Sequence, residues 1–180
     1  MNAALATSAT TALVLLATAG LPSAAAAQYR LPTVVSSFKA DSLHEVAVGL
    51  ANAGRFRDAA RLYRRSAEFR AVEDPQGFRC LTDAAAVSYA AGDRTGARSD
   101  MAHAAERALA RGDLRSAALS YLDAAWIAQE QENPGKVWEF GHRAEILADS
   151  PLLSESDRGA ILQRIERAPV AMRTALRAAR

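Results

Sequence analysis

Small and apolar residues recur along the chain at the three- and four-residue spacing that one face of a helix requires. In the clearest stretch these positions are Leu43, Val46, Ala47, Leu50, Ala59, Ala60, Tyr63 and Ala67. Gly54 divides the stretch, and a glycine commonly ends a helix because it accepts the left-handed conformation of the closing turn. The pattern therefore predicts two helices joined by a short turn. Only the β-branched run at 33–35 is typical of a strand.

The same succession of apolar stretches and turn residues continues to the end of the chain and predicts a series of helices. Those with the clearest ends cover residues 78–91, 95–110 and 114–131. Ser42 and Glu45 have the spacing of a capping box, which predicts that the first helix begins there. Because every connection is short, we expect consecutive helices to be antiparallel neighbours.

Turn glycines and alanines suggest how these helices assemble. Gly54, Gly92 and Gly135 fall at predicted turns and are spaced by about 40 residues, wider than the roughly 34 residues of a strict array of helix pairs. Such pairs bury their apolar stripes only when neighbouring pairs cover them. Alanine supplies much of the apolar share, so we expect helix axes to approach toward the lower end of the roughly 8–10 Å range. The sequence thus predicts an all-α array.

The residues at these helices and turns resemble the tetratricopeptide-repeat (TPR) family over about 41–148. The matching positions are Ala47, Gly54, Phe56, Ala59 and Tyr63 in the first pair, Ala85, Gly92 and Ala97 in the second, and Tyr121, Ala125 and Gly135 in the third. Ser88 and Arg94 stand where the second pair of the family has aromatic residues. The resemblance implies antiparallel helix pairs stacked as an α-α superhelix, and we expect capping helices at 149–180 to give it a polar end.

In the TPR family, ligands usually lie in the concave groove lined by the first helix of each pair. The resemblance places in that groove His44, Asn52, Arg79, Thr82, Tyr89, Leu122, Trp126 and Gln129. Trp126 is the strongest candidate, because tryptophan, tyrosine and arginine carry much of the energy at interfaces. It also lies in the apolar run 124–128, and packing of its ring in the core is the favoured interpretation, because large rings usually pack inside. Some family members bind the C-terminal carboxylate of a peptide with pairs of Lys and Asn residues on these helices. In this chain only Asn52 could correspond to one of them, so recognition of that kind is not expected.

Residues 1–27 predict a signal peptide, because an apolar stretch at 11–21 is followed by Pro22 and by alanines at 24–27. No basic residue precedes the apolar stretch, which leaves an uncleaved anchor or an Ala/Thr-rich tail as alternatives. The stretch is shorter than the roughly 20 residues that span a membrane. We therefore expect an exported protein, periplasmic or secreted, in which residues 28–40 form a linker.

Charge narrows the range of partners. The chain has 22 Lys and Arg against 20 Asp and Glu, a net charge of +2. A surface of mixed sign is poorly suited to nonspecific nucleic-acid binding, which depends on a basic face. The arginines near the C-terminus predict a polar capping helix, with contact to anionic lipid or an acidic partner as the alternative. The single cysteine, Cys80, lies in an apolar stretch and is predicted to be a small core residue.

A metal-binding helical bundle is the main alternative to a binding scaffold. Glu139 and His142 have the Glu-x-x-His spacing that projects two ligands from one helix face. Asp100 and His103 form a partial second copy, whereas a di-metal bundle requires two complete motifs and further inward glutamates. Because Glu139 and His142 lie beside Arg143, an exposed charged face is the favoured interpretation. We therefore expect no metal and no other cofactor.

Motifs of catalysis are absent from the sequence, which has no Gly-rich phosphate loop, no Gly-x-Ser-x-Gly elbow and no His-Glu-x-x-His. We therefore expect a scaffold, not an enzyme, that binds a protein or peptide partner in the cell envelope noncovalently through its groove. A purely structural assembly subunit is a further alternative. We expect no nucleic-acid partner and no stable membrane span, and the sequence leaves the oligomeric state open.

Overall fold

The computed structural model describes residues 34–177, which form eight helices and no strand. The helices are α1 (Val34–Asn52), α2 (Phe56–Glu68), α3 (Pro75–Ala90), α4 (Arg94–Ala110), α5 (Leu114–Glu130), α6 (Pro134–Ala148), α7 (Glu155–Glu166) and α8 (Val170–Arg177). The predicted all-α fold is confirmed for this part of the chain. The predicted signal peptide at 1–27 and the first part of the predicted linker lie outside the described residues.

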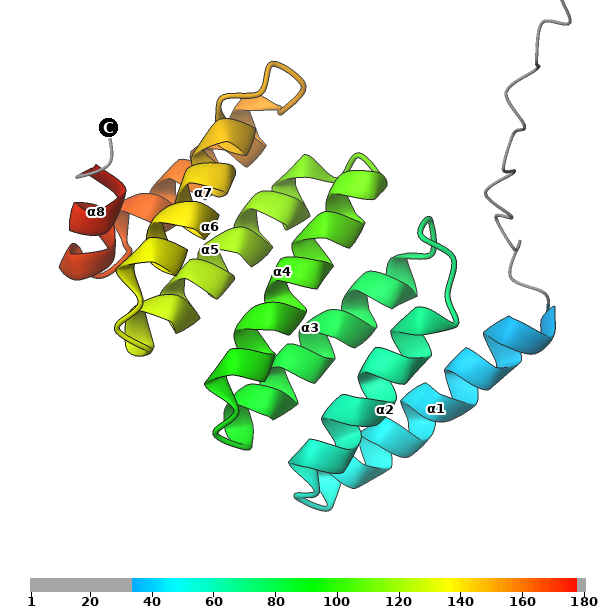
Figure 1. Ribbon diagram of the computed structural model, residues 1–180. Helices are drawn as coiled ribbons and strands as arrows, with labels where there is room; N and C mark the ends of the chain where they lie inside the picture. The colour runs from blue at the N-terminus through cyan, green and yellow to red at the C-terminus, as the bar shows by residue number, and fades with distance from the viewer. Residues whose placement is uncertain (1–33, 178–180) are drawn as a thin grey trace, which may run out of the picture. The chain divides into compact units, whose positions relative to one another are not determined.

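The first six helices lie side by side in chain order, each packed against the next (Figure 1). The last two helices break this order, because α7 packs mainly against α5 and α8 packs mainly against α6. The end of the chain thus turns back over the row instead of extending it. As a result α5 contacts α4, α6, α7 and α8, and it contains more buried residues than any other described helix.

The turns that precede α4 and α5 share one local structure. Gly92 and Gly112 adopt positive φ angles of 79° and 74°, a region that glycine enters without steric cost. The residues that follow them, Asp93 and Asp113, each accept a hydrogen bond from a backbone N–H in the first turn of the next helix. An aspartate in this position satisfies a donor that the helix would leave unpaired. The helix ends predicted near Gly92 and Gly112 are confirmed.

The turn before α6 differs from its prediction. The assignment of the turn to Gly135 is wrong, because Gly135 lies in the first turn of α6. Glu132 adopts the left-handed conformation instead, with a φ angle of 53°. Asn133 then caps the helix through a 3.1 Å hydrogen bond from the Lys136 N–H. Pro134 begins the helix, since proline fits the first helical position, where no N–H is needed.

The beginning of α1 also differs from its prediction. The capping box at Ser42 and Glu45 is wrong, because α1 begins at Val34 and both residues lie inside it. Packing on α2 holds the additional turns in place. Ala40 is fully buried, and the Ser66 hydroxyl donates a 2.7 Å hydrogen bond to its carbonyl oxygen. The part of the predicted linker that the structure describes is therefore helical.

Gly77 allows α4 to cap the end of α2. It lies inside the first turns of α3. Arg107 of α4 lies against this glycine and donates hydrogen bonds to three carbonyl oxygens, those of Ala67 (3.1 Å), Arg70 (2.7 Å) and Ala71. A Cβ at position 77 would overlap the guanidinium group of Arg107. Arg107 can therefore occupy this position only because Gly77 has no side chain.

Alanine forms much of the core, as the composition predicts. Residues that are at most 1% exposed include Ala59, Ala85, Ala97, Ala105, Ala118 and Ala124, from α2, α3, α4 and α5. Side chains this small let neighbouring helices pack closely. The larger fully buried side chains Val137, Ile161 and Met172 come from α6, α7 and α8 and belong to one cluster with α5. The C-terminal helices therefore supply the bulk that covers α5.

An ionic network joins α2, α3 and α4. Arg64 donates two hydrogen bonds to the Asp100 carboxylate, Nε to Oδ1 at 2.7 Å and Nη2 to Oδ2 at 2.9 Å. The same Nη2 donates to the Ser88 hydroxyl at 2.9 Å. The Asp100 side chain is only 4% exposed, and the hydrogen bonds that it accepts raise the pKa of the Arg64 guanidinium. Parallel N–H···O bonds of this kind fix geometry as well as charge, so the network orients the three helices.

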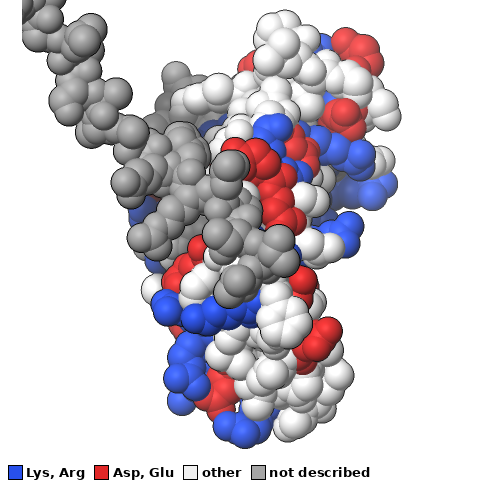
Figure 2. Space-filling model, turned by 90° about the vertical axis from the view of Figure 1, so that its right-hand side faces the viewer, with Lys and Arg blue, Asp and Glu red and all other residues white. Residues whose placement is uncertain are grey.

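Charged side chains of both signs are spread among other residues on the face that Figure 2 shows. Figure 2 shows Lys and Arg side chains intermixed with Asp and Glu side chains on the visible face. Several ion pairs join neighbouring turns of one helix, such as Arg65 and Glu68 at 3.0 Å on α2. Within residues 34–177, no helix combines the length and the apolar character that a membrane span requires.

Candidate functional site

A cavity of about 650 Å³ lies between α3, α4 and α5 on one side and the C-terminal helices α7 and α8 on the other. We call it the α3–α5 cavity. Its walls are mainly apolar and include Ala85, Met101, Leu122, Ile127 and Met172. Ligand pockets have volumes of roughly 300–1,000 Å³ and walls of this character. The cavity exists because the end of the chain turns back onto α5.

Two aromatic rings line this cavity. Tyr89 of α3 stacks on Trp126 of α5, with ring centroids 5.6 Å apart and ring planes at 30°. Trp126 remains 40% exposed, so the favoured interpretation, that its ring packs in the core, is wrong. Leu122, one turn earlier on α5, is buried and also lines the cavity. An accessible tryptophan beside an apolar hollow is typical of the energetic centre of an interface.

Polar contacts hold the Tyr89 ring in place. The Arg94 guanidinium lies 3.5 Å from the ring centroid, and its Nε is 3.2 Å from Glu130 Oε2. The Tyr89 hydroxyl donates to the Glu130 carboxylate at 2.8 Å, and this hydrogen bond raises the pKa of the hydroxyl. Because Arg94, Tyr89 and Glu130 contact one another, the orientation of the Tyr89 ring is fixed. Such preorganisation lowers the entropy lost on binding.

An ion pair joins two walls of the α3–α5 cavity. Arg164 of α7 donates a 2.6 Å hydrogen bond to the Asp123 carboxylate of α5. Burial raises the pKa of the Asp123 carboxyl, and the nearby Arg164 guanidinium opposes this shift. Arg167, which directly follows α7, also lines the cavity, and its side chain is exposed. The cavity therefore combines apolar walls with two guanidinium groups and one carboxylate.

The predicted site residues divide into two groups. Tyr89, Leu122 and Trp126 line the α3–α5 cavity. Outside its walls lie His44, Asn52, Arg79, Thr82 and Gln129. Asn52 and Arg79 are exposed, whereas the other three are partly buried. The structure thus brings together predicted residues of α3 and α5, while His44 and Asn52 lie apart from them on α1.

His44 belongs to a polar cluster that packs α1 against α2 and α3. Its Nδ1 lies 3.5 Å from the Cys80 sulfur, and the Ser66 hydroxyl lies 3.4 Å from the same sulfur. The His44 ring also packs edge-on against Tyr63, with centroids 5.3 Å apart. Cys80 is fully buried, and a reactive cysteine must be accessible to its substrate. The prediction that Cys80 is a core residue is confirmed.

The C-terminal wall of the cavity was not predicted from the sequence. It includes Arg164, Arg167 and Met172. Arg164 meets Asp123 across 41 positions of the chain, and no local pattern marks a contact of that range. The only related signal was the run of arginines near the C-terminus, which by itself predicts a polar cap.

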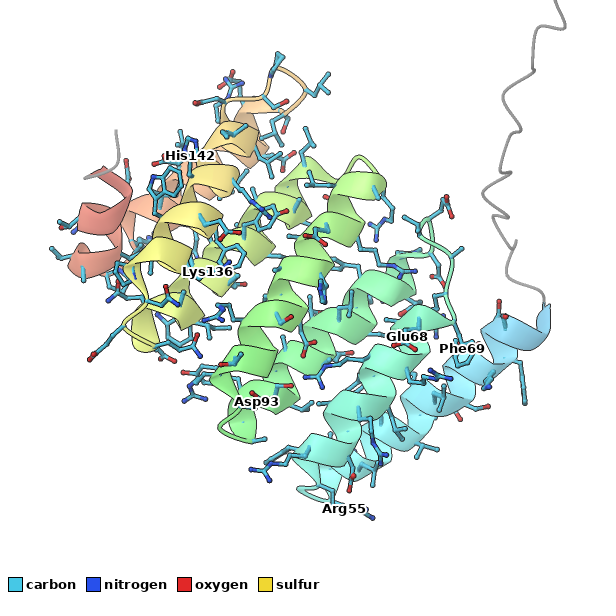
Figure 3. All side chains as sticks on the ribbon, viewed as in Figure 1. Arg55, Glu68, Phe69, Asp93, Lys136 and His142 are labelled. Carbon is cyan, nitrogen blue, oxygen red and sulfur yellow. The ribbon has the colours of Figure 1, made fainter. Side chains whose placement is uncertain are left out.

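Of the metal-binding alternative, Glu139 and His142 lie on α6, where Figure 3 labels His142, and the partial copy Asp100 and His103 lies on α4. Glu139 forms ion pairs with Lys136 at 2.6 Å and Arg143 at 3.3 Å. The exposed His142 ring stacks on Trp138, with centroids 5.2 Å apart and planes at 11°. Among the described residues, no group of three His, Cys, Asp or Glu side chains is arranged to hold a metal ion. The geometry of α6 is that of a solvated face with local ion pairs.

Two comparisons with known proteins identify no relative of this chain. No protein-family model matches the chain, and a search of curated proteins finds no match. The α3–α5 cavity, with its stacked rings and its guanidinium groups, therefore supplies the observations from which a function can be inferred.

Proposed function

We propose that the protein is a noncovalent scaffold that binds a protein or peptide partner at the α3–α5 cavity. In this proposal α1 to α6 form three antiparallel pairs stacked as in the TPR family, and the first helices of the pairs line a shared groove. The observation that carries the proposal is the accessible Trp126 ring, stacked on Tyr89 beside an apolar cavity. The partner binds without covalent chemistry, and the protein itself is not an enzyme.

The paired arrangement is supported by the turns and the packing order. Each of the first six helices packs against the next one in the chain, and connections as short as those before α4, α5 and α6 favour reversal of the chain direction. The left-handed residues Gly92, Gly112 and Glu132 fall at equal intervals. A constant interval between these turns favours a repeating array from α3 to α6.

The exposed area of Trp126 sets the scale of the binding energy. A tryptophan buries up to about 250 Å², so an exposed fraction of 40% leaves roughly 100 Å² for a partner to cover. At about 25 cal/mol per Å² this contact contributes roughly 2.5 kcal/mol. Residues that contribute about 2 kcal/mol or more are the hot spots of interfaces. Trp126 therefore has enough free surface to act as one.

A matched pair of tryptophan substitutions tests the proposal. Trp138 of α6 is 39% exposed, close to the value for Trp126, but lies outside the cavity. In fluorescence polarisation with a library of labelled peptides, we expect Trp126→Ala to weaken binding by roughly 60-fold. We expect Trp138→Ala to bind as the wild type does. Equal affinities of the two variants for every bound peptide would refute the proposed site.

A structural assembly subunit is the second candidate, because part of the outer face of α1 is apolar. Phe38 is 73% exposed and Val46 is 55% exposed on this helix. A second copy of the chain could cover them. Light scattering of the purified protein distinguishes the candidates, since an assembly subunit would form oligomers that Phe38→Glu disrupts. A monomer that still binds peptides would leave only the scaffold.

Export from the cytoplasm is part of the proposal and is supported by the apolar, alanine-rich sequence of residues 11–27. If the leader is removed where its small residues suggest, the mature chain begins at Gln28. Intact mass spectrometry of the protein from its native cells would show this shortened chain in the envelope or medium. Recovery of the full chain in the cytoplasm alone would contradict export.

A further inference from the structure

Polar groups stand at two places along α5, with Trp126 between them. Asp123 and its partner Arg164 lie on one side of Trp126. Glu130, which accepts a hydrogen bond from the Tyr89 hydroxyl, lies on the other side. Asp123 and Glu130 are two helical turns apart, a distance of about 10 Å. An extended chain rises about 3.5 Å per residue, so roughly three residues span this distance. The middle residue would then meet Trp126.

Arg167 adds to the cavity a positive charge that no described carboxylate pairs with. Arg164 is already paired with Asp123 at 2.6 Å. Arg167 lines the same cavity, and no ion pair joins it to a carboxylate of the described side chains. Glu166, the last residue of α7, precedes Arg167 in the chain, and no ion pair joins these two side chains. The cavity therefore presents one positive charge more than its own carboxylate balances.

We propose that the α3–α5 cavity takes a peptide segment in which a bulky apolar side chain stands next to aspartate or glutamate. The apolar side chain enters between Leu122 and Met172 beside Trp126, and the acidic side chain pairs with Arg167. This inference rests on the proposed function and adds the chemistry of the partner to it.

Labelled hexapeptides with capped ends test this chemistry on the full chain. Their third position is Phe or Ser, their fourth is Asp, Asn or Lys, and the other positions are mixtures. The variants are Arg167→Glu, Arg167→Lys and Trp126→Ala. The control is Arg57→Glu, since Arg57 is exposed on α2 and lies outside the cavity. Thermal melting of each variant shows that it is folded.

The expected result is a preference of the wild type for Phe-Asp over Phe-Asn and Phe-Lys. Arg167→Glu should weaken Phe-Asp binding by about tenfold and strengthen Phe-Lys binding, because a charge at the edge of an interface selects its partner by sign. Arg167→Lys, which keeps the charge, should retain the preference of the wild type. Arg57→Glu should change neither affinity.

Three results would overturn the inference. If peptides bind through Trp126 and Arg167→Glu leaves the preference for Asp unchanged, the acidic contact is wrong while the proposed function stands. If no peptide binds, or if Trp126→Ala binds all of them as the wild type does, both proposals fail. The third result is a competition in which palmitate displaces every bound peptide, and does so equally well from the wild type and from Arg167→Glu. The cavity would then be a lipid site in which Arg167 makes no contact specific to peptides.

Discussion

Asp100→Ala should lower the free energy of unfolding by about 3 kcal/mol, because it leaves two polar groups of the α2–α4 network without their shared acceptor. The Asp100 side chain is 4% exposed and accepts hydrogen bonds from Arg64 at 2.7 and 2.9 Å and from Ser88 at 3.3 Å. Breaking a buried ion pair costs about 3–5 kcal/mol. The Arg64 side chain is 37% exposed, so water can solvate its guanidinium group when Asp100 is removed. The lower end of that range therefore applies.

Urea unfolding followed by circular dichroism measures the effect. A loss of about 3 kcal/mol should also lower the melting temperature by roughly 6–12 °C in a domain of this size. Asp58→Ala is the matched control, since Asp58 also pairs with arginines but on the exposed face of α2, where such pairs contribute little. Arg64→Ala combined with Asp100→Ala isolates the interaction between the two side chains in a double-mutant cycle.

Two outcomes would refute this reasoning. An Asp100→Ala variant as stable as Asp58→Ala would mean that the network does not hold the three helices together. Additive effects of Arg64→Ala and Asp100→Ala would mean that the two side chains stabilise the fold independently, although the structure places them in direct contact.

Three further substitutions test the contact at Gly77, the close packing at Ala97 and the ion pair of Asp123 with Arg164. Gly77→Ala should displace Arg107 from the end of α2 and lower the melting temperature, whereas it should have little further effect in an Arg107→Ala background; additive effects would contradict the contact. Ala97→Leu should cost about 1–3 kcal/mol, because Ala97 is 0% exposed and a larger side chain overfills its site; an unchanged urea midpoint would count against close packing. Burial already raises the pKa of Asp123, so Arg164→Ala should raise it further, and stability should then decrease as the pH rises through that pKa. Carboxyl carbon NMR titration measures the change, and an unaltered midpoint would disprove the coupling.

The positions of the helices were largely predictable because turn residues act locally. Gly92 with Asp93 ends one helix and begins the next through contacts within a few residues, so the sequence alone indicates the boundary. The beginning of α1 was not predictable in this way, since it depends on Ala40 packing against α2. The left-handed conformation of Glu132 was not predicted, because a glutamate rarely adopts a positive φ angle.

The candidate site was predictable only in part. Tyr89 and Trp126 are aromatic residues on the first helices of two expected pairs, and the structure stacks them. Arg164 and Met172 could not be assigned to the site, because their positions depend on α7 and α8 turning back over α5 and α6. The same C-terminal sequence is equally compatible with two helices that extend the row, and long-range packing decides between these arrangements.

Binding at the α3–α5 cavity can be tested by following the two tryptophans of the chain while a peptide binds. Each indole N–H gives one signal in a ¹H–¹⁵N NMR spectrum, and Trp138→Phe assigns them. When the best-bound hexapeptide is added to saturation, the signal of Trp126 should shift strongly while that of Trp138 stays in place. A shift of the Trp138 signal alone, or bound peptide with neither signal moved, would contradict binding at the α3–α5 cavity.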